Sequence, residues 1–383
     1  MVLYLAFAIP VLAALVLYTF FKHKTKIWEV AIPMLFTILL ILGAKAICVS
    51  SLTGDTEYLG GMVYEVRYYE EWDEYIHQTC SRECCCSKDS DGHESCSTEY
   101  YDCSYVDNHP EYWEVVTTLG SFNVSENYYR YLVKKFEVAP TFKDMHRDYH
   151  SIDGDMYFAK WDNTDEKLEP VTITHSYENR PKVSSSIYRF EEVDTFDIRQ
   201  YKPYNYPEVN GLKQRVILGY DDPKAEHALQ VLNSRLGKEK QVRVYFLIFK
   251  NQPLDAGSIQ ERYWEGGNKN ELNVCIGIDD NNNVKWAYVF SWTEQSEVKV
   301  NIRTHIQESK KLDLYEYVNY TKAEVLENWV RKQFKDFDYL TIEPTMKQII
   351  WIYILTIIFN AGICVWIVNN EFDDEPRGKY YWK

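Results

Sequence analysis

The sequence predicts a membrane-anchored α+β protein with three transmembrane helices, a β-rich domain that contains most of the cysteines, and an α/β sandwich domain. Three observations predict this class. Three apolar stretches with almost no charge are long enough to cross a bilayer. A polar region, residues 50–345, separates the second stretch from the third. Within it, short alternating runs typical of strands give way after residue 205 to an amphipathic helix and nearly continuous apolar strands.

Composition and charge narrow the classes of function. The 383 residues carry a formal net charge of −15, and their mean hydropathy is −0.41 in spite of the apolar stretches. A nucleic-acid groove needs clustered lysines and arginines that displace counterions, so we expect no nucleic acid as a partner. The acidic balance also disfavours a domain that lies flat on anionic lipid.

Residues 1–49 are typical of two transmembrane helices joined by a short basic loop. Residues 2–21 contain no charge, and residues 30–49 contain only Lys45, whose long side chain can reach the headgroups. Neither the basic leader nor the small-residue cleavage site of a signal peptide is present. The loop, residues 22–26, is rich in lysine, so the positive-inside rule predicts that it faces the cytoplasm.

A third transmembrane helix is predicted within residues 346–368. Trp351 and Trp366 lie near its two ends, where aromatic side chains favour the membrane interface. If the first loop is cytoplasmic, residues 50–345 are periplasmic or extracellular and the tail, residues 369–383, is cytoplasmic. We therefore expect an integral protein of the cell membrane or inner membrane, in contact with the lipid bilayer.

Six cysteines are clustered near the start of the outer region. They are Cys80, Cys84, Cys85, Cys86, Cys96 and Cys103. Outside the cytoplasm such a cluster indicates disulfides, here stapling an exposed hairpin or loop, and six cysteines allow 15 pairings. A zinc site that combines thiolates with His77, His93 or His109 is the alternative, although paired C-x-x-C spacings are missing. The other three cysteines lie in apolar segments and are expected to be free buried thiols; they are Cys48, Cys275 and Cys364.

Residues 50–205 are expected to form the β-rich outer domain. Four runs alternate Val, Tyr, Thr or Trp with polar residues, as half-buried strands do. They are residues 62–72, 112–120, 169–178 and 185–194. One helix is predicted at residues 125–136, where Ser125 can cap the first turn and Tyr129, Leu132 and Val133 share a face.

Residues 213–345 are expected to form the α/β domain. An amphipathic helix at residues 222–236 has a proline near its start, and an apolar strand follows at residues 241–250. Two further strands are predicted at residues 271–279 and 284–292. The segment 298–307 and a final helix at residues 321–334 complete an order that is typical of an α/β sandwich.

About a third of the chain, from the helix at Glu226 through RVYFLIFK to YWEGGNKNELNVCIGIDDNNNVKWAYVFSW, resembles the TPM domain. The resemblance implies a small α/β domain held by a membrane helix on the outer or lumenal side. It also implies membrane-protein maintenance or, for some members, phosphatase activity. As a whole the chain is similar to uncharacterised envelope proteins of bacteria and their phages.

The resemblance further implies ligand contacts in the loop before the second strand. The residues are Trp264, Gly266, Gly267, Asn268, Lys269 and Asn270. Glycines let backbone amides approach a ligand, and Asn and Lys provide donors for oxyanions. The alternative is a simple turn.

Two other clusters could hold a divalent metal, zinc or calcium, although no cofactor is firmly implied. His146, Asp148 and His150 would share one side of a strand, and the alternative is a polar surface strand. Asp279 and Asp280, next to three asparagines, could chelate calcium or form a hairpin turn.

Two classes of function remain. The first is a membrane-anchored envelope protein whose outer domain binds a partner, itself a membrane or envelope protein, as a scaffold or in membrane-protein maintenance; a surface rich in Tyr and Trp suits an interface. The alternative is a membrane-tethered, metal-dependent hydrolase, phosphatase-like, in the α/β domain. No nucleophile elbow, phosphate loop or H-E-x-x-H motif is present, so catalytic residues are unknown.

Overall fold

The computed structural model describes residues 2–21, 27–88, 94–145, 154–164, 167–184 and 192–369. The chain divides into two compact units. The first consists of Met1–Thr56, Ser176–Arg189 and Gln333–Lys383, and the second of Glu57–His175 and Phe190–Lys332. Both units are therefore assembled from segments that are distant in the sequence.

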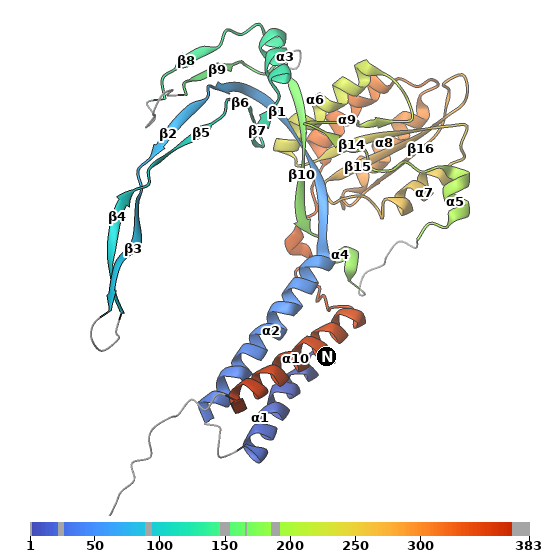
Figure 1. Ribbon diagram of the computed structural model, residues 1–383. Coiled ribbons are helices and arrows are strands. Elements are labelled where there is room, and N and C mark those ends of the chain that lie inside the picture. The colour runs from blue at the N-terminus through green and yellow to red at the C-terminus, as the bar shows by residue number, and fades with distance from the viewer. Residues whose placement is uncertain are drawn as a thin grey trace, which may run out of the picture. The chain divides into compact units, whose positions relative to one another are not determined.

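Three apolar helices form most of the first unit (Figure 1). They are α1 (Ala8–Phe20), which follows the 3-10 helix η1 (Val2–Phe7), α2 (Ile27–Thr53) and α10 (Met346–Asn369). Three spans are long and apolar enough to cross a membrane, which confirms this part of the prediction: Leu3–Phe20, formed by η1 and α1 together, Met34–Thr53 of α2, and Met346–Asn369. The side-chain amide of Asn360 on α10 donates to Thr37 Oγ1 on α2 (3.1 Å), a buried polar contact of the kind that joins membrane helices.

Two short elements complete the first unit. The helix α4 (Arg180–Val183) begins at Asn179, whose side chain accepts a hydrogen bond from the Lys182 amide (3.2 Å). The 3-10 helix η2 (Phe334–Phe337) precedes α10 in the chain. Both elements belong to the part of the first unit outside the three apolar helices.

A six-stranded sheet with the order β7-β6-β1-β9-β8, and with β10 also paired to β1, lies almost entirely in the second unit. Its strands are β1 (Gly54–Tyr69), β6 (Tyr112–Thr117), β7 (Gly120–Val124), β8 (Thr141–Lys143), β9 (Met156–Lys160) and β10 (Glu169–Glu178). The helix α3 (Glu126–Phe136) packs Leu132 and Phe136 against Val63 and Val115 of the sheet. Ser125 Oγ accepts a hydrogen bond from the Tyr128 amide (3.3 Å), so the predicted helix and its cap are confirmed.

The predicted strands of this region are confirmed in three of four cases. The first begins earlier than predicted, at Gly54, because the chain passes directly from α2 into β1. The fourth, residues 185–194, falls mostly outside the described residues, and its last residues 192–194 have no regular structure. Their sequence instead leads into α5 (Thr195–Tyr201), because the Asp194 side chain caps this helix by accepting from the Asp197 amide (2.8 Å).

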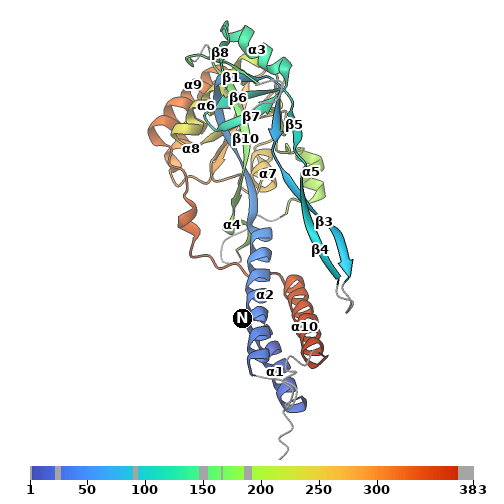
Figure 2. The ribbon, with the colours of Figure 1, turned by 60° about the vertical axis from the view of Figure 1, so that its left-hand side comes forward.

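Between β1 and β6 the chain forms an arm, residues 72–109. Two antiparallel ribbons follow one another in it: β2 (Trp72–Ile76) pairs with β5 (Tyr105–His109), and β3 (Thr79–Lys88) pairs with β4 (Glu94–Asp102). Figures 1 and 2 show this two-stranded arm leaving the six-stranded sheet. Among the described residues, no side chain of the arm belongs to a hydrophobic core.

The α/β domain has a four-stranded sheet in the order β13-β14-β15-β16. The strands are β13 (Ile217–Leu218), β14 (Arg243–Lys250), β15 (Glu271–Ile278) and β16 (Val284–Ser291); the first three are parallel and β16 is antiparallel to β15. The connector before it contains the small pair β11 (Val209–Asn210) and β12 (Lys213–Gln214). Both predicted apolar strands and the hairpin are confirmed.

Four helices pack on this sheet. They are α6 (Pro223–Glu239), α7 (Asp255–Tyr263), α8 (Ser296–Glu308) and α9 (Leu314–Asn328). The first matches the predicted helix, with Asp222 accepting from the Ala225 amide (3.0 Å). The predicted final helix, residues 321–334, is placed too late, because Asp313 caps α9 by accepting from the Glu316 amide (3.0 Å) and the chain is extended again at Trp329.

Candidate functional site

Two cysteine pairs of the arm lie at disulfide distance. Cys80 and Cys103 join the two strands near the β2–β5 end of the β3–β4 ribbon, and Cys86 and Cys96 join them near its tip, with Cα atoms 5.8 and 4.0 Å apart. Cys84 is a free, half-buried thiol, and the side chain of Cys85 lies outside the described residues, as does His93. Two-stranded ribbons are marginally stable in water, so such bridges would hold the arm in one conformation.

Aromatic side chains are exposed along the arm. Tyr100, Tyr101 and Tyr105 are 72%, 46% and 51% exposed. A tyrosine carries a large apolar ring and few rotatable bonds, which makes it a common anchor in protein interfaces. The arm also has nine acidic and only two basic residues, a formal net charge of −7.

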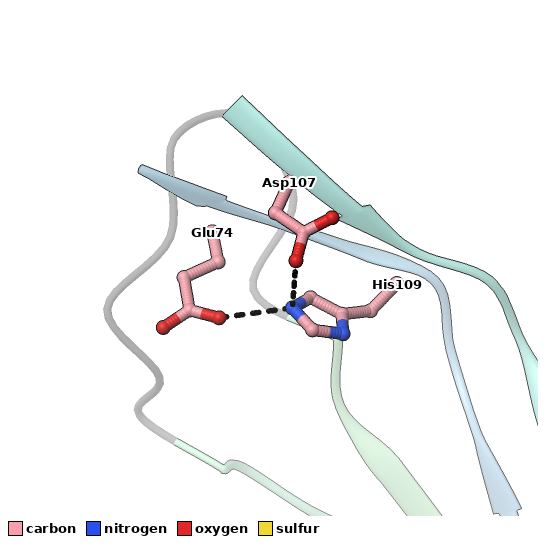
Figure 3. Close-up of side chains that lie close together, drawn as sticks. All are labelled: Glu74, Asp107 and His109. Atoms are coloured by element: carbon pink, nitrogen blue, oxygen red, sulfur yellow. Dashed lines mark hydrogen bonds and ion pairs between the residues drawn. The ribbon is translucent and has the colours of Figure 1, made fainter. Parts of the chain in front are cut away.

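At the base of the arm a histidine and two carboxylates converge (Figure 3). Glu74 on β2 lies directly opposite Asp107 on β5, and His109 lies opposite Trp72. The Nε2 atom of His109 is 2.9 Å from Glu74 Oε2 and 3.9 Å from Asp107 Oδ2. The imidazole stacks on the Trp72 ring, with ring centroids 4.2 Å apart and planes 10° apart. The sequence had suggested His109 only as a partner of thiolates; the register of the ribbon places carboxylates beside it.

The predicted ligand loop in the α/β domain is buried. Trp264, Asn268, Lys269 and Asn270 are all at most 6% exposed. The backbone amide and the side-chain amide of Asn268 both donate to the Glu271 carboxylate (3.0 and 2.9 Å). Burial raises the pKa of Glu271, against the effect of these donors. The backbone and side-chain amides of Asn268 are therefore occupied by hydrogen bonds within the protein.

The two glycines of this loop have a conformational role. Gly266 and Gly267 have φ angles of 83° and 77°, a region that side chains with a Cβ rarely adopt. A Cβ on Gly267 would also lie 2.6 Å from the Asn273 side chain. Both observations agree with the turn that was the alternative to a ligand loop.

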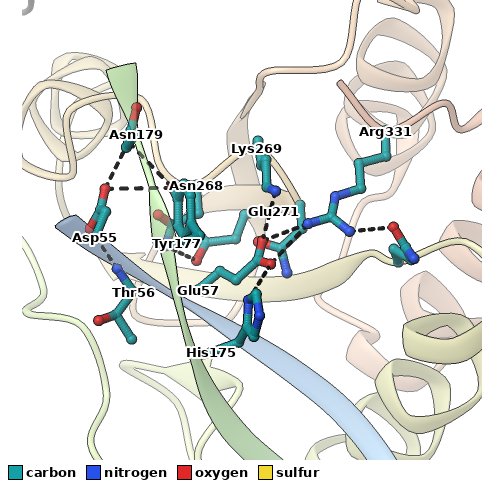
Figure 4. Close-up of polar contacts among 12 residues, drawn as sticks. Asp55, Thr56, Glu57, His175, Tyr177, Asn179, Asn268, Lys269, Glu271 and Arg331 are labelled. Carbon is teal, nitrogen blue, oxygen red and sulfur yellow. Dashed lines mark hydrogen bonds and ion pairs between the residues drawn. The ribbon is translucent and has the colours of Figure 1, made fainter. Parts of the chain in front are cut away.

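A buried carboxylate in the second unit connects the loop to distant segments (Figure 4). Glu57 accepts from the Arg331 guanidinium at 2.9 and 2.8 Å, and His175 Nδ1 lies 3.1 Å from its Oε1. Lys269 Nζ is 3.7 Å from Glu57 Oε2. Burial lowers the pKa of Lys269 to about 8, although the negative charge of Glu57 acts in the opposite direction. This charge network was not predicted, because its members have no regular spacing in the sequence.

Figure 4 also draws a separate polar cluster in the first unit. Asp55 Oδ2 accepts from the Asn179 side chain (2.7 Å) and lies 3.5 Å from the Tyr177 hydroxyl. These bonds hold the start of β1 to the end of β10 and to Asn179, which follows it. The cluster has a structural role at the exit from α2.

A groove of about 800 Å³ also lies in the first unit. Leu42 and Val49 of α2 and Leu340 and Ile342 contribute apolar side chains, and Arg180 stands at a polar part of its wall. The Arg180 guanidinium is held by Glu178 (3.1 Å) and by the Asp338 carbonyl (3.1 Å). The groove is an open depression, and the Lys45 ammonium in its wall donates to the Tyr4 hydroxyl (2.9 Å).

Two predicted metal sites remain. His146, Asp148 and His150 lie outside the described residues. Asp279 accepts from the amides of Asn281 (2.9 Å) and Asn283 (2.8 Å) within the turn between β15 and β16. The Asn283 side-chain and backbone donors hold the pKa of Asp279 well below its usual range. Those donors suit the hairpin turn, which was one of the two interpretations.

No protein-family model, characterised protein or solved structure matches the chain. The resemblance to the TPM domain stays a prediction.

Proposed function

We propose that the protein is a membrane-anchored binding protein of the cell envelope and that the arm is its contact surface for a partner protein. One observation carries the proposal. The arm is held by two cysteine pairs at disulfide distance and exposes Tyr100, Tyr101 and Tyr105 in its middle part, yet its described side chains add nothing to a hydrophobic core. A segment of this kind gains little stabilisation from the hydrophobic cores of its own chain. Its aromatic side chains are therefore available to bind another protein.

The charge of the arm indicates which kind of surface the partner presents. Nine acidic residues against two basic ones favour a partner with a cationic surface. The three apolar helices support an anchor in the bilayer, with the second unit on the outer side where the cysteines can pair. The TPM-like region would be consistent with a partner that is itself a membrane protein.

A photo-crosslinking experiment tests the proposal. A photoreactive phenylalanine replaces Tyr100 or Tyr105 in the full-length protein in native membranes, and Tyr315, 41% exposed on α9, serves as the control position. We expect one protein adduct at both arm positions and none at Tyr315. The adduct should also form with the purified partner.

The affinity of the purified pair gives the quantitative test. We expect Tyr100→Ala combined with Tyr105→Ala to weaken binding by roughly tenfold or more while the melting temperature stays unchanged. Binding should also weaken at high salt because the arm is acidic. Adducts of equal yield at all three positions, or unchanged affinity of the double variant, would overturn the proposal.

One observation favours a hydrolase as a second candidate, with its residues on β1 and β10 and not in the α/β domain where the sequence predicts it. The half-exposed imidazole of His175 is oriented by the buried Glu57, as a general base is oriented by a carboxylate. A hydrolase would lose turnover of a phosphate or carboxylate ester in His175→Ala and retain its fold. Equal hydrolysis by the parent and by His175→Ala would exclude this role.

A further inference from the structure

The base of the arm is a second place where chemistry-bearing side chains meet, independent of the tyrosines. We infer that Glu74, Asp107 and His109 form a binding site for zinc or a similar divalent transition-metal ion. All three side chains lie on one face of the β2–β5 ribbon, because Glu74 pairs with Asp107, His109 pairs with Trp72, and residues two apart on a strand share a face.

The separations of the donor atoms suit a single ion. One donor atom from each of Glu74, Asp107 and His109 lies within 4.8 Å of the other two. Zinc binds imidazole nitrogen and carboxylate oxygen at about 2.0–2.2 Å, so two donors in a tetrahedral shell are separated by roughly 3.3–3.6 Å. The observed distances of 2.9 and 3.9 Å from His109 Nε2 to the two carboxylates fall close to this range.

The electrostatics of the ribbon favour a bound cation. Two carboxylates directly opposite each other on paired strands repel, and a divalent ion between them removes that repulsion. Trp72 fixes the plane of the His109 ring by stacking on it, which lowers the entropy lost when the ring binds a metal. The site is thus partly organised before the ion arrives.

The donor set selects the class of metal. One imidazole nitrogen and two carboxylate oxygens suit zinc or its spectroscopic substitute cobalt, whereas calcium prefers oxygen donors throughout. Three protein donors leave at least one coordination position for water or for a ligand from outside the chain. The site differs from the predicted thiolate site, because no cysteine is part of it.

Cobalt titration of the tag-free, oxidised full-length protein in detergent tests the inference. We expect one Co²⁺ per chain with visible d–d absorption, no thiolate-to-cobalt charge-transfer band, and displacement by Zn²⁺ but not by Ca²⁺. His109→Ala should weaken binding by roughly tenfold or more. Glu74→Gln, which keeps the size of the side chain, should weaken it as well.

Two control variants separate this site from other sources of binding. Asn108→Ala changes a neighbour on the opposite face of the ribbon, where Asn108 donates to Asp73 (2.8 Å), and should leave the affinity unchanged. Cys84→Ser should also leave it unchanged. The inference is wrong if both His109→Ala and Glu74→Gln bind like the parent, if Cys84→Ser abolishes the spectrum, or if no cobalt binds.

Discussion

The arm and the α/β domain belong to the same compact unit but are stabilised by different interactions. Every residue of β15, and all but the last of β14, is buried, so burial of apolar surface holds the α/β domain together. In the arm, β5 is exposed except at its last residue, and cross-strand contacts and cysteine pairs hold the strands. The comparison teaches that a strand tyrosine such as Tyr245 of β14, which is fully buried, is explained by the fold of its own domain, whereas Tyr100 of the arm is not.

One arginine–glutamate ion pair joins the α/β domain to β1, and another lies in the arm. Arg331 reaches Glu57 in a buried pair, with side chains 12% and 2% exposed. Arg82 reaches Glu99 on the arm with a similar N–O distance, but these side chains are 65% and 49% exposed. The same chemistry should therefore have very different consequences for stability in the two places.

The largest expected effect is the loss of the buried arginine. Arg331→Met should lower the free energy of unfolding by about 3–5 kcal/mol, because Glu57 stays buried without its main partner. Arg82→Met should lower it by less than about 1 kcal/mol, because water solvates Glu99. Chemical denaturation of the detergent-purified full-length protein, followed by tryptophan fluorescence, measures both.

A double variant identifies the cause of the loss. If the unpaired charge destabilises Arg331→Met, adding Glu57→Met should recover part of the lost free energy. Equal losses in Arg331→Met and Arg82→Met would remove the distinction between the two regions.

The second effect concerns the arm itself. Replacing Cys80 and Cys103 by serine should destabilise the closed arm locally by about 3 kcal/mol, since the bridge closes a loop with a sequence separation of 23. Limited proteolysis should then cut the arm much faster, while global unfolding changes by no more than about 0.5 kcal/mol.

Cys84→Ser is the matched control for this variant, because Cys84 is a free thiol in the same ribbon. It should leave the rate of cleavage unchanged. A parent arm that is cleaved as fast as the serine variant would show that the bridge does not stabilise the arm.

Much of the α/β fold could be predicted because its signals are local. The apolar runs of β14 and β15 and the Asp222-Pro223 start of α6 lie within single segments of the chain. The start of α9 differs from the prediction although Asp313 and Glu316 form a capping pattern, because the prediction rests on the apolar periodicity after Thr321. Local signals thus predicted α6, β14, β15 and β16, misplaced α9, and predicted neither α7 nor the helical state of α8.

The candidate sites could be predicted only where residues are close in sequence. The cysteine cluster indicated a stapled hairpin, but the pairing depends on the register of β3 and β4. Glu74 and His109 meet through the register of β2 and β5, and Glu57 meets Arg331 across 274 positions. No spacing rule connects such residues, because the tertiary fold brings them together.

The smallest expected effect is a dependence of stability on pH that arises from a buried lysine of the α/β domain. Lys269 is buried in the α/β domain, and burial lowers its pKa to about 8 from the ordinary value of 10.5. Between these two pH values the unfolded chain binds more protons than the folded protein, so the free energy of unfolding should rise with pH, by on the order of 1 kcal/mol per pH unit. Denaturation at a series of pH values from about 7 to 10 should give a slope that is more positive in the parent than in Lys269→Met by this amount; burial also raises the pKa of the Cys275 thiol, which contributes in the opposite direction to both variants alike. Lys213→Met, which removes a half-exposed lysine paired with Glu169, should keep it. An equal slope in the parent and in Lys269→Met would assign the pH dependence to other groups and leave the buried network without a titrating member in this range.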